Sequence, residues 1–464
     1  MNIGDFYLTK TNKLNVIYHI PSGNICKVSD EIFDCLKRND YDNQEVIKLL
    51  SALNELPVIK TGKNKPKSEL LNNVLFISSE NCNLRCKYCF VEHGRYNGKT
   101  DTKNMDLETY IDSIRYALHR YPKGIKSIGF FGGEPLLNFD TIKEFVLWYE
   151  ESVLNKNKDL YRTKFGIVTN GTLANADVIN FLIEHDIAVT LSIDGPKDVN
   201  DSARVMVNGE SSYDIIFNNL DLWSNDKLTL GIEATINNYH IKNYRPGIVK
   251  DWIDNLRKLN FNDLAMFTVV TDNEDTKITD AITLGKIYNE VVDYWFDKIL
   301  NEDDLKCVDT FVLGMTNNIL LKRYVSSCSV YNSLTVDPCG KTFPCQMFCQ
   351  SGSYCMGSIQ DQTDTKRDKI IEELMLTDRN DVKDCKDCWV RNFCTTWCKG
   401  NSQNSGGNLT STVRIQCLQT KLIAERIIYN LALLLSDPEK MARFTRNFNR
   451  LKDSLGEKQD ASIY

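Results

Sequence analysis

Six apolar runs of strand length alternate with segments of helical periodicity between residues 74 and 270. The runs cover residues 74–79, 125–132, 164–170, 188–194, 229–236 and 264–270. Two of the segments between them start at an aspartate that can cap a helix, Asp106 and Asp140. Repeated strand and helix at this scale is typical of parallel strands joined by crossover helices. The pattern predicts an α/β fold with a partial (β/α)6 barrel, whose chemistry lies at the carboxyl ends of the strands.

The rest of the chain divides around this barrel, which we place at residues 70–272. Residues 1–66 hold three strand candidates and two helix candidates that Ser29 and Asn43 can cap, and a lysine-rich linker joins them to the barrel. Three segments follow the barrel: a helical connector at 273–325, a cysteine-rich domain at 326–420, and a C-terminal helix with a tail at 421–464.

Three cysteines with CxxxCxxC spacing, Cys82, Cys86 and Cys89, come directly after the first apolar run. Three thiolates can hold three irons of a cubane cluster, and the fourth iron then has a vacant position for chemistry. The spacing also leaves open a zinc site or a redox CxxC site. With the aromatic residue that follows it, the motif resembles the signature of radical S-adenosylmethionine (SAM) enzymes. This resemblance implies a [4Fe–4S] cluster whose vacant iron chelates the amino acid end of SAM.

A second set of candidate residues stands where the later strands end, and one more lies among the three cysteines. These candidates for SAM binding are Gly132, Gly133, Glu134, Thr169, Asn170, Ser192, Arg204 and Tyr88. Glycines let a backbone approach a ligand, a carboxylate can receive an ammonium group, and hydroxyl and guanidinium groups can bind a ribose or a carboxylate.

The family resemblance assigns a part of SAM to several of these residues. The GGE segment at 132–134 matches the one that binds the amino group. Ser192 and Arg204 match the residues that hold the SAM carboxylate in the branch of sulfatase and peptide maturases. Tyr88 matches a position whose backbone faces the adenine. An exposed surface position remains the alternative for Arg204, and Asp194 is interpreted as a turn residue.

The C-terminal cysteines follow the seven-cysteine pattern of the SPASM domain, which in the family holds auxiliary clusters. By that pattern one [4Fe–4S] cluster has the ligands Cys385, Cys388, Cys394 and Cys417. A second has Cys328, Cys345 and Cys398, with its fourth ligand open among Cys339, Cys349 and Cys355, or supplied by a substrate thiol. Zinc in the segment from Cys385 to Cys398 is the alternative.

The composition fits metal ligation in a reducing compartment. Sixteen cysteines are more than packing requires, and disulfides are rare in the cytoplasm. The net charge is −6, and an N-terminal signal peptide and long apolar segments are lacking. We therefore expect a cytoplasmic protein that binds neither nucleic acid nor membrane.

The order of the domains resembles that of enzymes that modify ribosomally made peptides (RiPP maturases). Residues 1–66 resemble their winged-helix-like recognition element, which binds a precursor's leader peptide as an added strand; a plain scaffold is the alternative. The segments CNLRCKYCF and FFGGEPLLNF look closest to enzymes that form thioether crosslinks in ranthipeptides and sactipeptides. The implied cofactors are SAM and three [4Fe–4S] clusters, and the implied partners are a Cys-rich precursor peptide and an electron donor such as flavodoxin or ferredoxin.

Two kinds of alternative function remain. One is other radical SAM peptide chemistry: carbon–carbon crosslinking, epimerisation or formylglycine formation. Gln346 argues against the last, because sulfatase maturases carry at this position an aspartate that serves as a base, and an amide cannot accept a proton at neutral pH. The other is a non-catalytic iron–sulfur or zinc protein that binds peptides.

Overall fold

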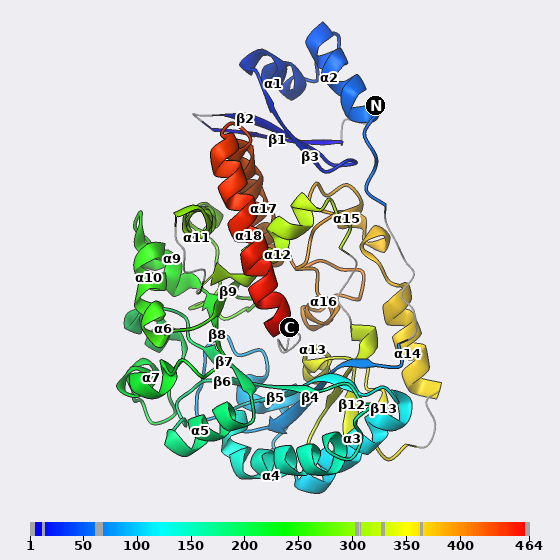
Figure 1. Cartoon of the computed structure of the whole chain (residues 1–464), viewed down its shortest axis with the longest axis vertical. Helices are drawn as coiled ribbons and strands as arrows, with labels where there is room; N and C mark the ends of the chain where they lie inside the picture. The colour runs from blue at the N-terminus through cyan, green and yellow to red at the C-terminus, as the bar shows by residue number, and fades with distance from the viewer. Residues whose placement is uncertain are drawn as a thin grey trace.

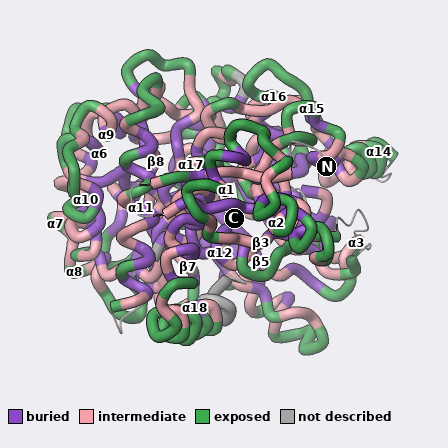
Figure 2. The backbone as a smooth tube through the Cα atoms, turned by 90° about the horizontal axis from the view of Figure 1, so that it is seen from above, coloured by how far each residue is buried: buried purple, intermediate pink, exposed green. Residues whose placement is uncertain are grey.

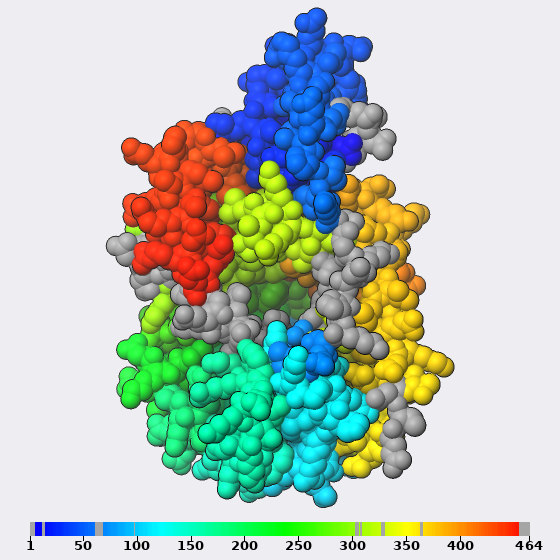
Figure 3. All heavy atoms as spheres, turned by 45° about the vertical axis from the view of Figure 1, so that its right-hand side comes forward, coloured from blue at the N-terminus to red at the C-terminus, as the bar shows by residue number. Residues whose placement is uncertain are grey.

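The computed structural model describes residues 5–11, 14–60, 68–301, 306, 308–325, 330–361 and 365–459. Figure 1 shows a small N-terminal domain at one end, the large sheet at the other, and the C-terminal helices between them. In the space-filling view the N-terminal domain projects above the rest of the molecule (Figure 3). Seen from above, buried backbone fills the interior and exposed segments form the rim (Figure 2).

The N-terminal domain has the predicted order of three strands and two helices. Its antiparallel sheet has the order β1-β2-β3, and the elements are β1 (Phe6–Lys10), β2 (Asn15–His19), β3 (Asn24–Val28), α1 (Asp30–Lys37) and α2 (Gln44–Asn54). The Ser29 and Asn43 side chains accept hydrogen bonds from the first turns of α1 and α2, so both predicted caps are confirmed.

Strand β2 is buried on both faces, because the N-terminal sheet packs on its own helices and also on the rest of the protein. Ile17 belongs to a small core with Leu36 and Val46, whereas Val16 and Tyr18 belong to the main core. Tyr7 stacks on Trp389 with ring centroids 3.7 Å apart. The N-terminal domain therefore packs against the cysteine-rich segment and is not attached by the linker alone.

All six predicted barrel strands are present and parallel. They are β4 (Leu71–Ser79), β5 (Ile125–Gly132), β6 (Lys164–Thr169), β7 (Ile187–Ser192), β8 (Leu230–Ile236) and β9 (Asp263–Thr268). Eight helices lie in the connections: α3 (Leu107–Arg120), α4 (Phe139–Tyr149), α5 (Ala176–Glu184), α6 (Lys197–Ala203), α7 (Ser212–Asn218), α8 (Leu220–Trp223), α9 (Asn238–Lys242) and α10 (Ile248–Leu256). These six strands are built mostly from apolar residues, which suits strands that helices cover.

One predicted helix cap is wrong. Asp106 caps α3 by accepting a hydrogen bond from the Thr109 amide, as expected. Asp140, in contrast, lies within the first turn of α4, whose N-cap is Asn138. A single 3-10 turn, Pro135–Asn138, runs directly into α4, and the Asn138 amide donates to the Ser78 and Met105 carbonyls instead of capping the helix.

The sheet continues beyond the six predicted strands. Its order is β10-β9-β8-β7-β6-β5-β4-β11-β12-β13, where the added strands are β10 (Val308–Asp309), β11 (Ser333–Val336), β12 (Lys341–Phe343) and β13 (Gly357–Ser358). Strand β11 pairs in parallel with β4, and β12 and β13 continue antiparallel. The cysteine-rich region is thus joined to the barrel through the strand that leads into Cys82.

The remaining helices belong to the connector and the C-terminal half. They are α11 (Ala281–Asn301), α12 (Thr310–Leu320), α13 (Gln346–Ser351), α14 (Thr365–Leu376), α15 (Lys383–Lys386), α16 (Lys399–Asn404), α17 (Arg414–Leu434) and α18 (Pro438–Gln459). The C-terminal segment was expected as one helix but forms two, because Pro438 starts a new helix after a short turn. Helix α17 packs along α11, where Arg426 pairs with Asp293. Within the described ranges, every helix is too short or too polar to cross a bilayer.

Candidate functional site

The segment of residues 81–90, here called the three-thiol loop, lies between the end of β4 and residues 203–207. The Arg85 amide donates to the Val205 carbonyl at 2.7 Å, and the Lys87 amide donates to the Ala203 carbonyl at 3.0 Å. The Val207 amide donates back to the Asn83 carbonyl at 3.1 Å. This ladder brings Arg204 beside the loop.

The three thiols of this loop form one half-buried group. Burial raises the pKa of Cys82 to about 12, with a smaller contribution from Glu134, and burial raises the pKa of Cys86 to about 12. The pKa of Cys89 is also raised by burial. Cys82 and Cys89 both act electrostatically on Cys86, so the thiols are close together. Soft thiol donors that become thiolates only beside a strong positive charge fit an iron–sulfur cluster.

Gly132 and Gly133 let the end of β5 contact the three-thiol loop. The Gly133 amide donates to the Ser79 carbonyl, and the Glu134 amide donates to the Asn81 carbonyl, both at 2.8 Å. A Cβ on Gly132 would lie 2.3 Å from the Ser79 oxygen, and one on Gly133 would lie 2.2 Å from the Asn81 oxygen. Both positions therefore require glycine, because a side chain there would push the thiol loop away.

Glu134 joins the ends of β5 and β6. Its fully buried carboxylate accepts hydrogen bonds from the Thr169 hydroxyl at 2.7 Å, the Asn170 amide at 2.8 Å and the Leu136 amide at 3.0 Å. Burial raises the pKa of Glu134 to about 7, although these bonds oppose the shift. The Asn170 side chain in turn donates to Asn83 of the three-thiol loop at 2.9 Å.

Tyr88, Asp194 and Arg204 form a buried polar group beside the thiols. The Tyr88 hydroxyl donates to Asp194 Oδ2 at 2.6 Å, and Arg204 Nε donates to Asp194 Oδ1 at 2.9 Å. Arg204 is 8% exposed, which rules out the alternative of a surface arginine. Ser192, at the end of β7, is half-buried.

Asp194 is more than the turn residue that the sequence indicated. It accepts a third hydrogen bond from the Thr235 amide at 3.0 Å, and its backbone carbonyl contacts His240 Nε2 at 2.8 Å. Its partners come from the thiol loop, the segment after α6, β8 and α9, so one residue joins four parts of the chain. The Asp-Gly-Pro sequence alone carries no signal for such long-range contacts.

Four C-terminal thiols also lie together. Burial raises the pKa of Cys385 to about 12, and Cys394, Cys417 and Cys388 raise it further. Burial raises the pKa of Cys417 to about 11, with contributions from Cys394 and Cys388. We call these residues, Cys385, Cys388, Cys394 and Cys417, the four-thiol group.

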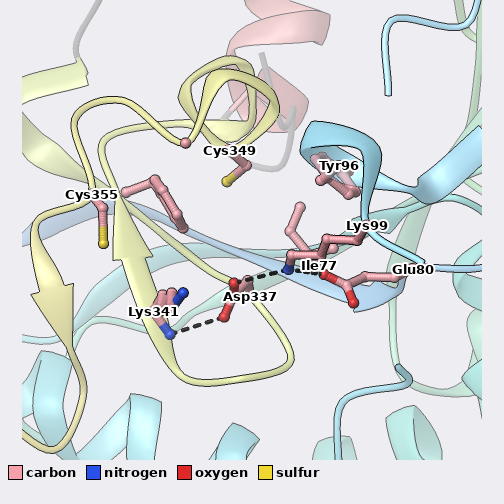
Figure 4. Close-up of a pocket in the computed structure, with 10 residues that line it drawn as sticks. Ile77, Glu80, Tyr96, Lys99, Asp337, Lys341, Cys349 and Cys355 are labelled. Carbon is pink, nitrogen blue, oxygen red and sulfur yellow. Dashed lines mark hydrogen bonds and ion pairs between the residues drawn. The ribbon is translucent and has the colours of Figure 1, made fainter. Parts of the chain in front are cut away.

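A cavity of about 190 Å³ lies between the barrel and the cysteine-rich region (Figure 4). Cys349 and Cys355 lie on one side, opposite Glu80 and Lys99. Cys349 is buried and is close enough to Cys345 and Cys355 that both thiols raise its pKa, after the larger effect of burial.

The other cysteines expected near this cavity differ in their exposure and in their contacts. Cys339 is exposed, so it is the weakest of the three candidates for the open fourth ligand. Cys328 falls outside the described residues. Cys398 N-caps α16, with its sulfur 3.4 Å from the Asn401 amide. Among the described residues, no three His, Cys, Asp or Glu side chains converge as they would around a single metal ion.

Three charged residues that line this cavity form a network of ion pairs. Lys99 pairs with Glu80, which lies two residues before Cys82, and with Asp337 at 3.4 Å. Asp337 also accepts from the Cys339 and Lys341 amides at 2.9 Å. The network therefore connects the start of the three-thiol loop to the turn between β11 and β12 (Figure 4).

The family comparison identifies the barrel. The model of the Radical SAM superfamily matches residues 76–229, which include the three-thiol loop, the GGE segment, Asp194 and Arg204. Residues 76–229 are a radical SAM domain. The prediction of an α/β radical SAM fold followed by a cysteine-rich region is thereby confirmed.

Curated relatives match most of the length of this chain. A cysteine-type anaerobic sulfatase-maturating enzyme of Clostridium novyi is 25% identical and covers 76% of the chain and 94% of itself. The radical SAM cyclopropyl synthase TigE of Paramaledivibacter caminithermalis is 22% identical and covers 89% of the chain and 92% of itself.

Solved structures share the fold of this chain. The structure of anSMEcpe with bound AdoMet has a TM-score of 0.64 at 20% identity and covers 81% of this chain and 98% of its own. Streptococcus suis SuiB bound to precursor peptide SuiA has a TM-score of 0.51 at 14% identity and covers 87% of this chain and 96% of its own.

Proposed function

We propose that this chain is a radical SAM enzyme that forms Cys thioether crosslinks in a ribosomally made, cysteine-rich precursor peptide. The observation that carries the proposal is the shared cavity: Glu80 of the barrel and Cys349 and Cys355 of the cysteine-rich region line it together. A peptide segment held there would lie between the start of the three-thiol loop and the thiols of Cys349 and Cys355.

In the proposed reaction, different residues of the radical SAM domain hold the cluster and bind SAM. Cys82, Cys86 and Cys89 hold the first [4Fe–4S] cluster. SAM bound to that cluster supplies a 5′-deoxyadenosyl radical that takes a hydrogen atom from the peptide. Asp194 accepts a hydrogen bond from Nε of Arg204, so the Nη groups of Arg204 are left for the SAM carboxylate. We assign Ser192 to the same carboxylate.

The other candidates position the SAM site or its loop. We assign Thr169 and Asn170 to the ribose, the backbone of Tyr88 to the adenine, and the GGE segment at 132–134 to the amino group. Because Glu134 already accepts three hydrogen bonds within the chain, its contribution to SAM binding is chiefly to fix the ends of β5 and β6.

Two auxiliary [4Fe–4S] clusters complete the proposal. The four-thiol group holds one. Cys328, Cys345 and Cys398 hold the other. Cys349 is buried and Cys355 half-buried, and both lie near Cys345, which favours one of these two over the exposed Cys339 as its fourth ligand. The substrate's thiol would lose its proton and bond to the carbon radical, and an auxiliary cluster held by these cysteines would supply the acceptor for the surplus electron.

A second candidate is carbon–carbon bond formation within a peptide. The similarity to a cyclopropyl synthase over 89% of the chain favours it. Formylglycine formation is less favoured, because Gln346 occupies the position of the expected base at the start of α13.

One experiment separates these chemistries. The reconstituted protein is incubated anaerobically with SAM, a reductant and its precursor peptide, and the product is alkylated at free thiols before mass spectrometry. A thioether removes two hydrogens and one alkylatable thiol per bond. A carbon–carbon bond removes hydrogens but no thiol, and epimerisation changes neither. A product with all its thiols still alkylatable contradicts the thioether proposal, and absence of methionine and 5′-deoxyadenosine contradicts both candidates.

We further propose that the N-terminal domain binds the leader of the peptide, that flavodoxin or ferredoxin supplies electrons, and that the enzyme is cytoplasmic. Deleting residues 1–66 is a poor test of leader binding, because Val16 and Tyr18 are part of the main core. The better test leaves the enzyme intact and compares peptides with and without the leader. Equal affinities contradict the proposal.

A further inference from the structure

Arg379 is a buried arginine without a matching anion in the described part of the chain. It lies in the turn Arg379–Asp381 and is only 2% exposed. Its Nη1 donates to the Cys394 carbonyl, whereas Nε and Nη2 lack a hydrogen-bond partner. A buried cation with unpaired donors costs considerable free energy unless a negative charge lies beside it.

The acidic neighbour of Arg379 in sequence is engaged elsewhere. Asp378 accepts from the Tyr324 hydroxyl at 2.6 Å and from the Asn380 amide at 3.0 Å. The guanidinium lies over the Tyr324 ring, 5.2 Å from its centroid. Among the described residues, no carboxylate forms an ion pair with Arg379.

Besides Tyr324, Arg379 faces thiols. It acts electrostatically on Cys385, and it is hydrogen-bonded to the backbone of Cys394, so it borders two members of the four-thiol group. The Val382 amide donates to the Arg379 carbonyl at 3.0 Å, and the Cys385 amide donates to the Val382 carbonyl at 3.0 Å. The same short segment thus positions the cation and the first thiol.

Other cations near this group differ from Arg379. Lys421 acts on Cys388 and Cys417 but is exposed, so water screens its charge. Arg391 acts on Cys388 and donates to the Lys386 carbonyl at 3.1 Å. Arg379 alone combines burial with unused donors among these three.

We infer that Arg379 is the built-in charge partner of the iron–sulfur cluster held by Cys385, Cys388, Cys394 and Cys417, and that it raises the reduction potential of that cluster. The inference rests on the proposed assignment of these cysteines. Four thiolates and an iron–sulfur core carry net negative charge, which the unused guanidinium donors can satisfy. A nearby cation stabilises the reduced, more negative state of the cluster, and so favours acceptance of an electron.

The test compares the full-length wild type with Arg379→Met, Arg379→Lys and the control Arg367→Met, all reconstituted anaerobically. Arg367 is a suitable control because it is also mostly buried, but it is paired with Asp368 and Tyr121. Iron content is measured first, and a potentiometric titration followed by electron paramagnetic resonance then gives the midpoint potential of each cluster.

We expect Arg379→Met to shift one midpoint potential to a more negative value. Arg379→Lys, which keeps the positive charge, should keep that potential close to the wild-type value. Arg367→Met should leave all potentials unchanged. Loss of about four irons in Arg379→Met but not in Arg379→Lys also supports the inference, because lysine keeps the positive charge that methionine lacks. Full iron content with unchanged potentials in Arg379→Met overturns it, as does equal loss of iron in both Arg379 variants. A wild type that lacks iron at the four-thiol group instead refutes the cluster assignment itself.

Discussion

Asp194 and Arg204 form an ion pair inside the protein, with 2.9 Å between Oδ1 and Nε and side-chain exposures of 0% and 10%. Tyr88 completes the group from within the three-thiol loop. Asp194 therefore fixes both the arginine that we assign to the SAM carboxylate and the loop to which we assign the first cluster.

We predict that Asp194→Asn destabilises the protein and slows SAM cleavage. Removing one charge of a buried pair leaves the other unpaired, which costs about 3–5 kcal/mol. Chemical denaturation measures the loss, and the rate of 5′-deoxyadenosine release measures the effect on cleavage. Asp214→Asn is the matched control, because its pair with Lys197 is exposed to solvent and should contribute little. Equal stability of the two variants would refute the prediction.

The Gly133→Ala variant should lose the first cluster selectively. Its Cβ would lie 2.2 Å from the Asn81 oxygen and displace the three-thiol loop. We expect a loss of about four irons and of SAM cleavage, with the auxiliary clusters retained. Iron analysis together with electron paramagnetic resonance checks this. Gly314→Ala, in helix α12 with open space around its Cβ, is the control and should keep all the iron. A fully loaded Gly133→Ala protein would contradict the close contact.

The strands of the barrel were predictable because each is a mostly apolar run of strand length that is followed by a segment of helical periodicity. Strand β11 was missed because it has only four residues and is held by pairing with β4, about 260 positions earlier. Its position matters for function, since this pairing places the cysteine-rich region beside the three-thiol loop.

The candidate site was predictable wherever a residue type is required by chemistry, as for the cysteines and the GGE segment. Asp194 and Arg379 were not, because their importance lies in partners that are distant in sequence. A turn-forming Asp-Gly-Pro and an arginine in a polar stretch look ordinary until the fold buries them. The N-cap position of α4, Asn138, lies two residues before the predicted Asp140, because the preceding 3-10 turn runs directly into the helix.

The stability of the protein should fall as the pH rises from about 4 to about 7, in part because of Asp309. Burial raises the pKa of this carboxyl from 3.8 to about 7. The unfolded chain therefore releases its proton at lower pH than the folded protein, so deprotonation favours unfolding across this interval. Asp309→Asn keeps an acceptor oxygen for the Val312 or Met266 amide and removes the titration. Thermal denaturation from pH 4 to 8 should show a smaller decline for the variant, and parallel curves would refute the assignment.

The auxiliary site should be needed for the product but not for SAM cleavage. We predict that Cys388→Ala still releases 5′-deoxyadenosine when reduced with SAM, because the three-thiol loop is intact, but forms no crosslinked peptide. Mass spectrometry of the alkylated peptide and quantification of 5′-deoxyadenosine measure the two outcomes in one sample. Normal crosslinking by this variant would exclude a role for the four-thiol group in the reaction.

The central claim is that Cys82, Cys86 and Cys89 hold a cluster that splits SAM. Its most direct test is to quantify methionine and 5′-deoxyadenosine after the anaerobically reconstituted, reduced protein meets SAM, for the wild type and for Cys82→Ala. We predict both products from the wild type and neither from the variant. A wild type that yields neither product, or a variant that yields both at the wild-type rate, would contradict the account.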